Sequence, residues 1–425
     1  MHQALPARGI PPLIKRNTAL FAFSQAFMGA GTQLGYGIGP LMVISLTQSA
    51  SLAGLTVALF GISRFLVAYP VGRITDRHGR KPGIQLGLAL GLIGTVAVGV
   101  AMLIHAIVAL VFGMLIFGMG ISAAQQMRVA ATDMFPPQQR ALALGFVATG
   151  SLLGIVISPA LMWTAEAAAT RLGAPPIALP WLMVPVLIVA GMVLVTLVHP
   201  DPREIGINLE RYYPGYKADA SRGGAEPSAT SFSARALWRE LPTRLAIVCN
   251  GAAQGNMAIV MVLTSLVLAH HGHSLTAITM SHMFHSIGMF GFMIPLGRLA
   301  DRVGREPVMY PGVATTLVGA LFVTFGAQYW SVTLGTFLVG LGWSAANVAS
   351  TALIADHATT LHRGRAIGVN DSAAGAMTLA AAVVTGPLVE YTGLPAAGIA
   401  AALVAAVPLV LLGIAHLSNA ERSSA

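Results

Sequence analysis

The chain has 425 residues, of which 55% are hydrophobic and only 9% are charged, and its mean hydropathy is positive. A soluble globular protein of this length needs more charge to cover its surface, so the composition excludes that class. The net charge of +9 does not indicate nucleic-acid binding, because the basic residues lie in alternate loops between apolar segments. A lipid bilayer is the expected surrounding, and no nucleic-acid partner is expected.

Apolar stretches of about 20 residues, long enough to cross a hydrocarbon core of roughly 30 Å, recur along the chain. We predict twelve membrane-spanning helices, at residues 17–46, 51–71, 83–105, 106–131, 141–163, 181–199, 244–269, 275–296, 307–327, 331–354, 366–390 and 394–417. The first span is too long for the core of a signal peptide, so we interpret it as a retained helix. The single cysteine, Cys249, lies in an apolar helix, which excludes a disulfide framework.

The distribution of positive charge predicts the orientation. All but two of the 24 Lys and Arg residues fall on one side of the predicted membrane, the exceptions being Arg64 inside a helix and Arg171 in an opposite loop. Basic loops remain in the cytoplasm, so both termini are expected there. The sequence therefore predicts a multi-pass protein of the cell inner (plasma) membrane.

Residues 200–243 interrupt the apolar pattern. A stretch rich in Gly, Ser, Ala and Pro near Ser221–Ser228 is followed by residues 233–241, whose apolar positions share one face of a short helix. We interpret the segment as a cytoplasmic linker ending in an amphipathic helix at the membrane surface, with a regulatory ligand-binding loop as the alternative. It separates an N-terminal six-helix half, residues 1–199, from a C-terminal one, residues 244–425.

An eleven-residue charged stretch occurs twice, once in each half. The first copy runs from Gly72 to Pro82 and the second from Gly297 to Pro307, so matched positions share one constant interval, close to half the length of the chain. Each copy follows one apolar run and precedes another. Two glycines, one aspartate and several arginines between two such helices predict a tight charged turn at a membrane surface.

This duplicated pattern resembles the loop between the second and third helices, and its echo between the eighth and ninth, in the major facilitator superfamily of secondary transporters. Gly118 and Gly120 parallel Gly340 and Gly342, so the resemblance extends beyond the loop. It implies an all-α membrane protein of twelve transmembrane helices in two pseudo-symmetric six-helix halves. It also implies a conformational gate made of Gly72, Arg73, Asp76, Gly79, Arg80, Asp133, Gly297, Asp301, Arg302 and Arg305. Asp76 is expected near the cytoplasmic start of the eleventh helix.

Two positions depart from patterns found in many members of that superfamily. The fourth helix has Met114 and Ile116 where an arginine is usual, and the fifth has Ser158-Pro159 where antiporters have Gly-Pro. These departures leave the transporter interpretation intact and weaken a specific assignment to drug/proton antiport.

Polar residues inside apolar helices are the candidates for a substrate path, because a polar group in lipid is costly. The first, fourth, seventh and tenth helices line the central cavity in the superfamily. In this chain those helices carry Gln25, Gln33, Tyr36, Gln125, Gln126, Asn250, Gln254, Asn256, Trp343 and Asn347. The alternative for each is a hydrogen bond that joins two neighbouring helices.

Three ionisable residues are candidates for proton coupling or for a latch between the halves: Arg64, Asp371 and His285. Arg64 and Asp371 lie on helices that face one another in the superfamily, so a pair weakened by protonation of Asp371 is one interpretation. In the other, Arg64 extends to the membrane surface or meets an anionic substrate. His285 lies near the middle of its helix, and its alternative is a packed, hydrogen-bonded histidine.

No catalytic arrangement, zinc spacing or phosphate-binding glycine loop accompanies these residues, so we expect neither an enzyme nor a cofactor. His270, His271 and His273 are interpreted as solvated loop residues. We predict a monomeric secondary active transporter that moves a small organic solute by alternating access, coupled to protons, with export favoured. The alternatives are proton-coupled uptake of a metabolite, a lipid or lipid-linked flippase, and a non-transporting receptor or scaffold.

Overall fold

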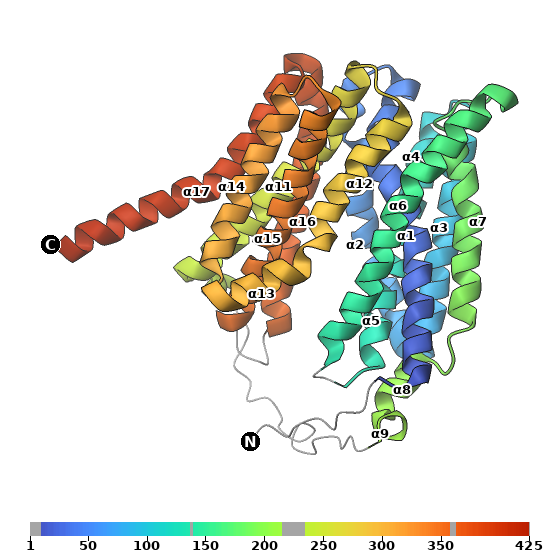
Figure 1. The fold of residues 1–425 in the computed structure, drawn as a ribbon, viewed down its shortest axis with the longest axis horizontal. Helices are drawn as coiled ribbons and strands as arrows, with labels where there is room; N and C mark the ends of the chain where they lie inside the picture. The colour runs from blue at the N-terminus through green and yellow to red at the C-terminus, as the bar shows by residue number, and fades with distance from the viewer. Residues whose placement is uncertain (1–9, 137–138, 215–233, 358–362, 425) are drawn as a thin grey trace.

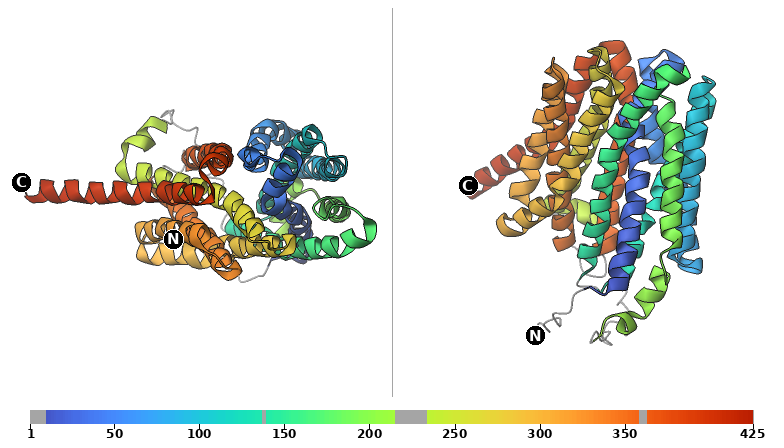
Figure 2. Two further views of the ribbon diagram at one scale, coloured as in Figure 1. Left: turned by 90° about the horizontal axis from the view of Figure 1, so that it is seen from above. Right: turned by 45° about the vertical axis from the view of Figure 1, so that its right-hand side comes forward.

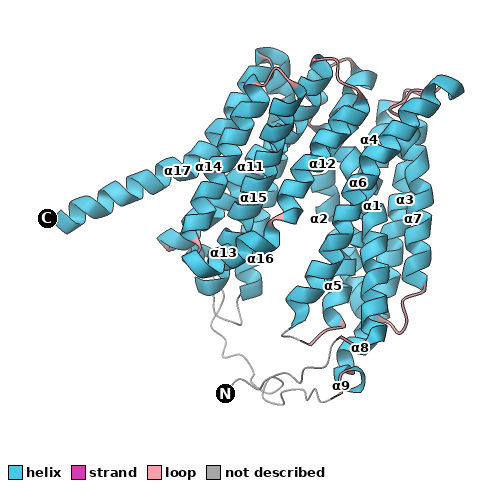
Figure 3. Cartoon of the chain, viewed as in Figure 1, coloured by secondary structure: helices cyan, strands magenta, loops and turns pink. Residues whose placement is uncertain are grey.

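The computed structural model describes residues 10–136, 139–214, 234–357 and 363–424. Within these ranges the regular structure is helical and contains no β-strand (Figure 3). Helices satisfy their backbone hydrogen bonds within one segment, as a chain in lipid must. At some helical positions, among them Arg64, Gly72, Arg73 and Asp76, the side-chain surroundings lie outside the described set.

The N-terminal half contains seven α-helices and one short 3-10 helix among its described residues. They are α1 (Pro12–Thr47), η1 (Ala50–Leu52), α2 (Leu55–His78), α3 (Arg80–Leu103), α4 (Ile107–Ala124), α5 (Gln126–Asp133), α6 (Arg140–Leu172) and α7 (Leu179–Thr196). The predicted fourth span is divided, because α4 ends and α5 begins on either side of Gln125.

Three short helices follow, and then the helices of the C-terminal half. The short ones are α8 (Pro202–Ile207), α9 (Leu209–Tyr212) and α10 (Ala234–Arg239). The C-terminal half contains α11 (Leu241–His270), α12 (Leu275–Gly291), α13 (Met293–Val303), α14 (Glu306–Phe325), α15 (Tyr329–His357), α16 (Arg363–Thr392) and α17 (Leu394–Ser424). The predicted eighth span is divided at Phe292, between α12 and α13.

Ten of the twelve predicted spans are long and apolar enough to cross a membrane, judged from the described residues. The other two correspond to α1 and α2, of 36 and 24 residues, which lie in the same bundle (Figure 1). Glycines and the polar residues Gln25 and Gln33 lower the apolar content of α1. The count of twelve therefore stays a prediction for these two helices.

The two halves repeat one packing scheme. In the first, α3 packs against α4 and α7, and α1 packs against α6 and α7. In the second, α14 packs against α15 and α17, and α11 packs against α16 and α17. Figure 2 shows the halves as two neighbouring groups of helices when the molecule is seen from above. The repeat in the sequence thus corresponds to a repeat of tertiary contacts.

The charged stretch is shorter as a turn than predicted. Helix α2 continues to His78 and α3 begins at Arg80, so one residue, Gly79, separates them. Gly79 has φ +97°, a conformation that glycine adopts without steric cost, and its twin Gly304 has φ +100°. Most of the predicted turn is helical because the helices extend until this single left-handed residue reverses the chain.

The first part of the predicted linker packs against the N-terminal half. Ile205 on α8 is fully buried, and Tyr213 donates a hydrogen bond to the carbonyl oxygen of Met134 at 3.2 Å. Burial raises the pKa of Tyr213, so its hydroxyl stays protonated and keeps this donor role. Leu237 on α10 is buried and Trp238 is half exposed, a two-faced pattern like the one predicted for residues 233–241. Residues 221–228 lie outside the described ranges.

The two halves lie close together at one end of the bundle and diverge toward the other (Figure 1). We call the end that carries α8 and α9 the basic end, because Arg77, Arg80 and Lys81 are also located there. The opposite end is called the latch end, for the contacts of Glu166 and Glu390 described below. The contacts at these two ends are described separately below.

Replacing Gly120 on α4 with valine should destabilise the N-terminal half, because a Cβ there would overlap backbone atoms of Gly91 and Gly87 on α3. Overpacking of this kind costs about 1–3 kcal/mol. Gly375→Val is the matched control, since a Cβ at that helical glycine has no neighbour within 4 Å. Thermal unfolding in detergent should give a lower Tm for Gly120→Val alone, and equal Tm values for the two variants would contradict this packing.

Candidate functional site

Glu166, on α6 of the N-terminal half, binds the first turn of α12 in the C-terminal half. Its carboxylate accepts hydrogen bonds from the backbone N–H of Leu275 at 2.9 Å and from the hydroxyl of Thr276 at 2.5 Å. A weaker bond comes from the Thr276 N–H at 3.4 Å. The first N–H groups of a helix have no partner within it and carry partial positive charge, which a carboxylate stabilises. Glu166 therefore joins the two halves at the latch end.

Glu390, on α16 of the C-terminal half, makes the reciprocal contact. Its carboxylate accepts hydrogen bonds from the Ser51 N–H and the Ser49 hydroxyl, both at 2.5 Å, at the start of η1 before α2. The interval of the sequence repeat places Thr276 opposite Ser51, and it relates Glu166 to Glu390 to within one position. The structure thus contains two pseudo-symmetric latches, each a carboxylate from one half on a helix start of the other.

Small residues let the backbones approach closely beside these latches. A Cβ on Gly54 would overlap the carbonyl of Ala382, and one on Gly386 would overlap the carbonyl of Ser51. Both contacts cross between the halves. Glycine is needed at these positions because no larger residue leaves room for the opposing backbone.

A second set of contacts, which we call the central seam, joins α1 to α11 and α12 in the middle of the bundle. Gln33 on α1 donates its side-chain amide to the hydroxyl of Ser286 on α12. The Ser265 hydroxyl on α11 donates to the carbonyl oxygen of Gly37 on α1 at 2.7 Å. These groups are neutral, so the seam joins the halves through hydrogen bonds without placing a charge pair there.

Two buried histidines lie on α12 at the seam. His282 Nε2 is 2.9 Å from the Ser265 hydroxyl, whose proton is directed at Gly37, so Nε2 is the donor. His285 Nδ1 donates to the carbonyl oxygen of Thr336 on α15 at 2.8 Å. The remaining ring nitrogens, Nδ1 of His282 and Nε2 of His285, are buried acceptors that no described residue bonds. Each histidine thus holds one hydrogen bond and keeps one nitrogen able to take a proton.

The structure distributes the predicted cavity residues among different environments. Gln33 reaches the seam, whereas the Asn347 amide donates to Asn250 Oδ1 at 3.0 Å within the C-terminal half. Asn256 donates to the Ala401 carbonyl oxygen at 2.8 Å, which is the helix-joining role that the sequence left open. The remaining members are partly exposed or buried, on α1, α5, α11 and α15 or at the break between α4 and α5: Gln25, Tyr36, Gln125, Gln126, Gln254 and Trp343. Their part in a substrate path stays a prediction.

At the basic end the charged turns form pairs within each half. Arg80 Nε lies 2.6 Å from Asp133 Oδ2, and Arg305 Nε lies 3.0 Å from Asp356 Oδ2. Asp301 also binds Arg305, and these hydrogen bonds raise the pKa of the Arg305 guanidinium, which stays charged. Asp133 and Asp356 thereby hold the starts of α3 and α14 against the ends of α5 and α15. The proposed gating role of these residues is not tested by this geometry.

Asp201 adds a contact to the first turn that the sequence did not predict. Its carboxylate accepts hydrogen bonds from the backbone N–H groups of Arg80 at 3.1 Å and Lys81 at 3.0 Å, so it caps α3. A Cβ on Gly79 would lie 2.9 Å from this carboxylate. The start of the linker is thereby attached to the charged turn of the N-terminal half.

The predicted partner of Arg64 is not visible, because the Arg64 side chain lies outside the described set. Asp371 is exposed on α16, and it is not without an interaction partner. The pairing of these two residues, and the placement of Asp76, remain predictions.

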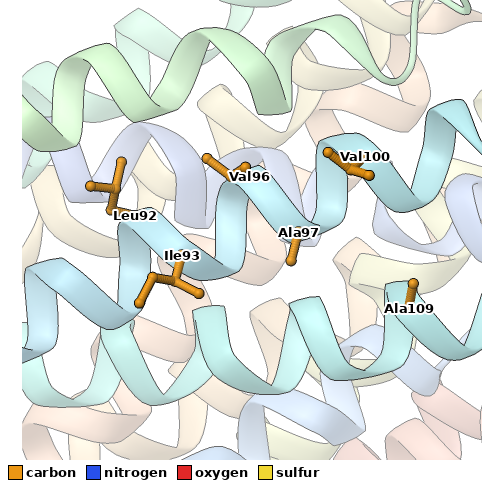
Figure 4. Close-up of a pocket in the computed structure, with 6 residues that line it drawn as sticks. All are labelled: Leu92, Ile93, Val96, Ala97, Val100 and Ala109. Carbon is orange, nitrogen blue, oxygen red and sulfur yellow. The ribbon is translucent and has the colours of Figure 1, made fainter.

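One groove lies on the outer surface between α3 and α4 (Figure 4). It is lined by Leu92, Ile93, Val96, Ala97, Val100 and Ala109. These side chains present only carbon, and Ile93 is 56% exposed. Such a surface fits the acyl chains of a bilayer and supplies no group that could orient a polar solute.

Sequence reasoning missed Glu166 and Glu390, although a signal was present. Each is an acidic residue toward the end of an apolar helix, and the interval between them differs by one position from that of the repeat. Ser265 and Ser286 gave no such signal, because serines are frequent in helices and only the tertiary contact distinguishes these two.

Replacing Glu166 with glutamine should weaken the latch by about 1 kcal/mol, since the shape is kept while the charge on the start of α12 is lost. Glu390→Gln should act in the same direction and more weakly, because Glu390 is exposed to solvent. Distances between spin labels across the latch end should show a larger separated population in Glu166→Gln. Glu240→Gln, an exposed residue before α11, is the control. An unchanged distance distribution in both latch variants would show that these contacts do not hold the halves together.

Comparisons with known proteins agree with this architecture. The family profile described as Major Facilitator Superfamily matches residues 20–248 and again 243–424, once for each half. The "Uncharacterized MFS-type transporter YdeG" of Bacillus subtilis (strain 168) is 29% identical over 364 residues, covering 84% of this chain and 82% of the relative. The "Riboflavin transporter RfnT" of Brucella anthropi is 23% identical over 386 residues, covering 89% and 90%.

The fold is also found among solved structures. The crystal structure of the nucleoside transporter NupG superposes with a TM-score of 0.69 at 12% identity, over 94% of this chain and 97% of that one. The duplicated charged turn, the repeated helix packing and the match of the family profile to both halves lead to one conclusion: the chain belongs to the Major Facilitator Superfamily and is a multi-pass membrane transporter of a small solute.

Proposed function

We propose that this transporter is proton-coupled and moves a small organic solute by alternating access. One observation carries the proposal. Among the described residues, the hydrogen bonds between the halves lie at the latch end and along the central seam, and the ion pairs at the basic end stay within each half. Two halves joined in this way can rock about the seam and open one end at a time.

We infer that the basic end lies in the cytoplasm, because Lys and Arg accumulate in cytoplasmic loops. The state described here is then open toward the cytoplasm, and Glu166 and Glu390 close the external side. In the opposite state the basic ends would approach one another. We propose that Asp76 then lies at the positive start of α16, as the resemblance to the superfamily implies, while Arg80 and Asp133 hold the turn in shape.

Proton coupling is assigned to the central seam and to Asp371. His282 and His285 are neutral in the hydrogen-bond pattern described above, and each keeps one buried acceptor nitrogen that no described residue bonds. A proton added to either would need a new hydrogen-bond acceptor, which a rearranged seam or a bound solute could supply. Protonation and movement of the halves would then depend on each other.

Export remains our proposal for the direction, with uptake as the second candidate. Riboflavin, or a solute with similar hydrogen-bonding groups, is a candidate solute, because one relative is named a riboflavin transporter. The amide and hydroxyl groups at the seam suit a polar solute better than a lipid chain, which counts against a flippase.

Purified protein in liposomes that contain a pH-sensitive dye should dissipate an imposed pH gradient when its solute is added. Riboflavin is the first solute to test, because its fluorescence reports movement independently of the proton. The expected result is solute movement that depends on the gradient and reverses when the gradient is reversed. Solute movement at the same rate with and without the gradient would contradict proton coupling.

His285→Gln should flatten the pH dependence of transport, since glutamine can still donate to the Thr336 carbonyl but cannot be protonated. His357→Gln is the matched control, because His357 bonds its own helix carbonyl at Leu353 and is exposed. Initial rates measured as a function of pH, over a range that extends well below neutrality, should separate the two variants. A His285→Gln profile that matches the unmodified protein would exclude His285 as the titrating group.

A further inference from the structure

Arg128, in the N-terminal half, binds no carboxylate within the described part of the chain. It lies on α5, five residues before Asp133 at the end of that helix, so it lies about 8 Å inside the basic end. The residue is partly buried, and its Nε is fully buried without a hydrogen-bond acceptor among the described residues. The bond that it makes is long, from Nη2 to the Ser151 hydroxyl at 3.4 Å. A guanidinium in a membrane helix is costly unless it is paired.

The carboxylates on neighbouring elements are engaged or distant. Helix α5 packs against α1, α3, α4, α6 and α8. Asp133, on α5 itself, binds Arg80, and Glu166 of α6 binds α12 at the latch end. Glu204 lies on α8 at the basic end, where it is exposed. The charged groups described on α1 and α3 are cations themselves: Lys15, Arg16, Arg80 and Lys81. Within the residues that the structure describes, Arg128 therefore keeps an uncompensated charge.

The C-terminal half shows that the fold does not require this charge. Asp133 and Asp356 are equivalent, because each binds the arginine of its charged turn, so Arg128 corresponds to Thr351, five residues before Asp356 on α15. Thr351 accepts a hydrogen bond from Asn370 of α16 at 3.4 Å, which resembles the contact from Arg128 to α6. A neutral pair thus occupies the equivalent position.

A second buried polar group, on the part of α1 that packs against α6 near Ser151, also lacks a hydrogen-bond donor within the described residues. Ser151 and Gly150 on α6 pack against α1, where Ala22 and Gly29 are their neighbours. Gln25 lies between those two positions of α1 and close to the same face, is 4% exposed, and its Oε1 has no hydrogen-bond donor among the described residues. Figure 1 shows α5 and the adjoining part of α6 on the side of the N-terminal half that faces the other half. Arg128 and Ser151 are located on these two elements, α5 and α6.

We propose that Arg128 binds the anionic group of the transported solute, a carboxylate or a phosphate monoester, with Ser151 as a second donor and Gln25 beside them. The guanidinium supplies parallel N–H donors that match two oxygens of either group, and an anion would compensate the buried charge. This inference rests on the proposed transport function and adds the substrate class to it.

Thermal unfolding of the full-length protein in detergent tests the binding step without transport. Two pairs of probes differ in charge: benzoate with benzamide, which has nearly the same shape, and phenyl phosphate with phenol, which lacks the phosphoryl group. At about 10 mM, at least one anion should raise Tm by a few degrees and its neutral partner should not. Benzoate and phenyl phosphate together distinguish a carboxylate from a phosphate site.

The anion-dependent rise should be lost in Arg128→Gln and in Arg128→Met, and partly kept in Arg128→Lys, which retains the charge without the paired N–H geometry. Arg239→Gln is the control, because Arg239 is exposed on α10. If Arg128→Gln and Arg128→Met are too unstable to measure, Arg128→Lys decides alone. The Tm rise with benzoate divided by the Tm rise with phenyl phosphate is then compared between Arg128→Lys and the unmodified protein. No stabilisation by either anion, or an equal rise in Arg128→Gln, would overturn the proposal. Both outcomes are independent of whether the protein moves protons, so a failed transport assay would not be mistaken for a failed anion site.

Discussion

The two halves of this transporter are joined by an electrostatic contact that occurs twice with the roles exchanged. Glu166 of the first half binds the start of α12, and Glu390 of the second binds the residues before α2. A carboxylate at a helix start satisfies N–H groups that have no partner inside the helix, so each latch removes an unfavourable feature from both halves. These bonds are charge-assisted yet exposed enough to exchange with water. The contact can hold one conformation without making it permanent.

The central seam and the basic end have different chemistry. The seam joins neutral groups, so separating them would leave no isolated charge in lipid. At the basic end, equivalent ion pairs tie a helix start to its neighbour within each half. Asp201 breaks this symmetry, because it attaches the linker to the first turn only. Arg128, for which the structure describes no carboxylate, lies in the same half, so charge is distributed unequally between halves that share one fold.

The sequence by itself determined the helical architecture. Apolar runs of membrane length, basic loops on one side and a repeat at about half the chain length are regular features, so they predict helices, halves and a pair of charged turns. Ten of the twelve spans are confirmed by length and composition among the described residues. Several helix ends differ from the prediction, by as many as nine residues for α6, which was predicted to end at residue 163 and ends at Leu172. Each charged stretch proved to be mostly helix around Gly79 or Gly304, because the local pattern does not record where a helix leaves the membrane.

Only the tertiary structure decided which polar residues meet. Asn256 and Gln33 have the same character in sequence, yet one bonds α17 within its half and the other crosses to α12. Glu166 binds residues that are 109 and 110 positions away in the sequence, and Glu390 binds Ser51, which is 339 positions away. Such pairings depend on the relative rotation of two packed halves. Hydropathy and repeat spacing describe each half separately, so they carry no information about the angle at which the halves meet or the end at which they are closed.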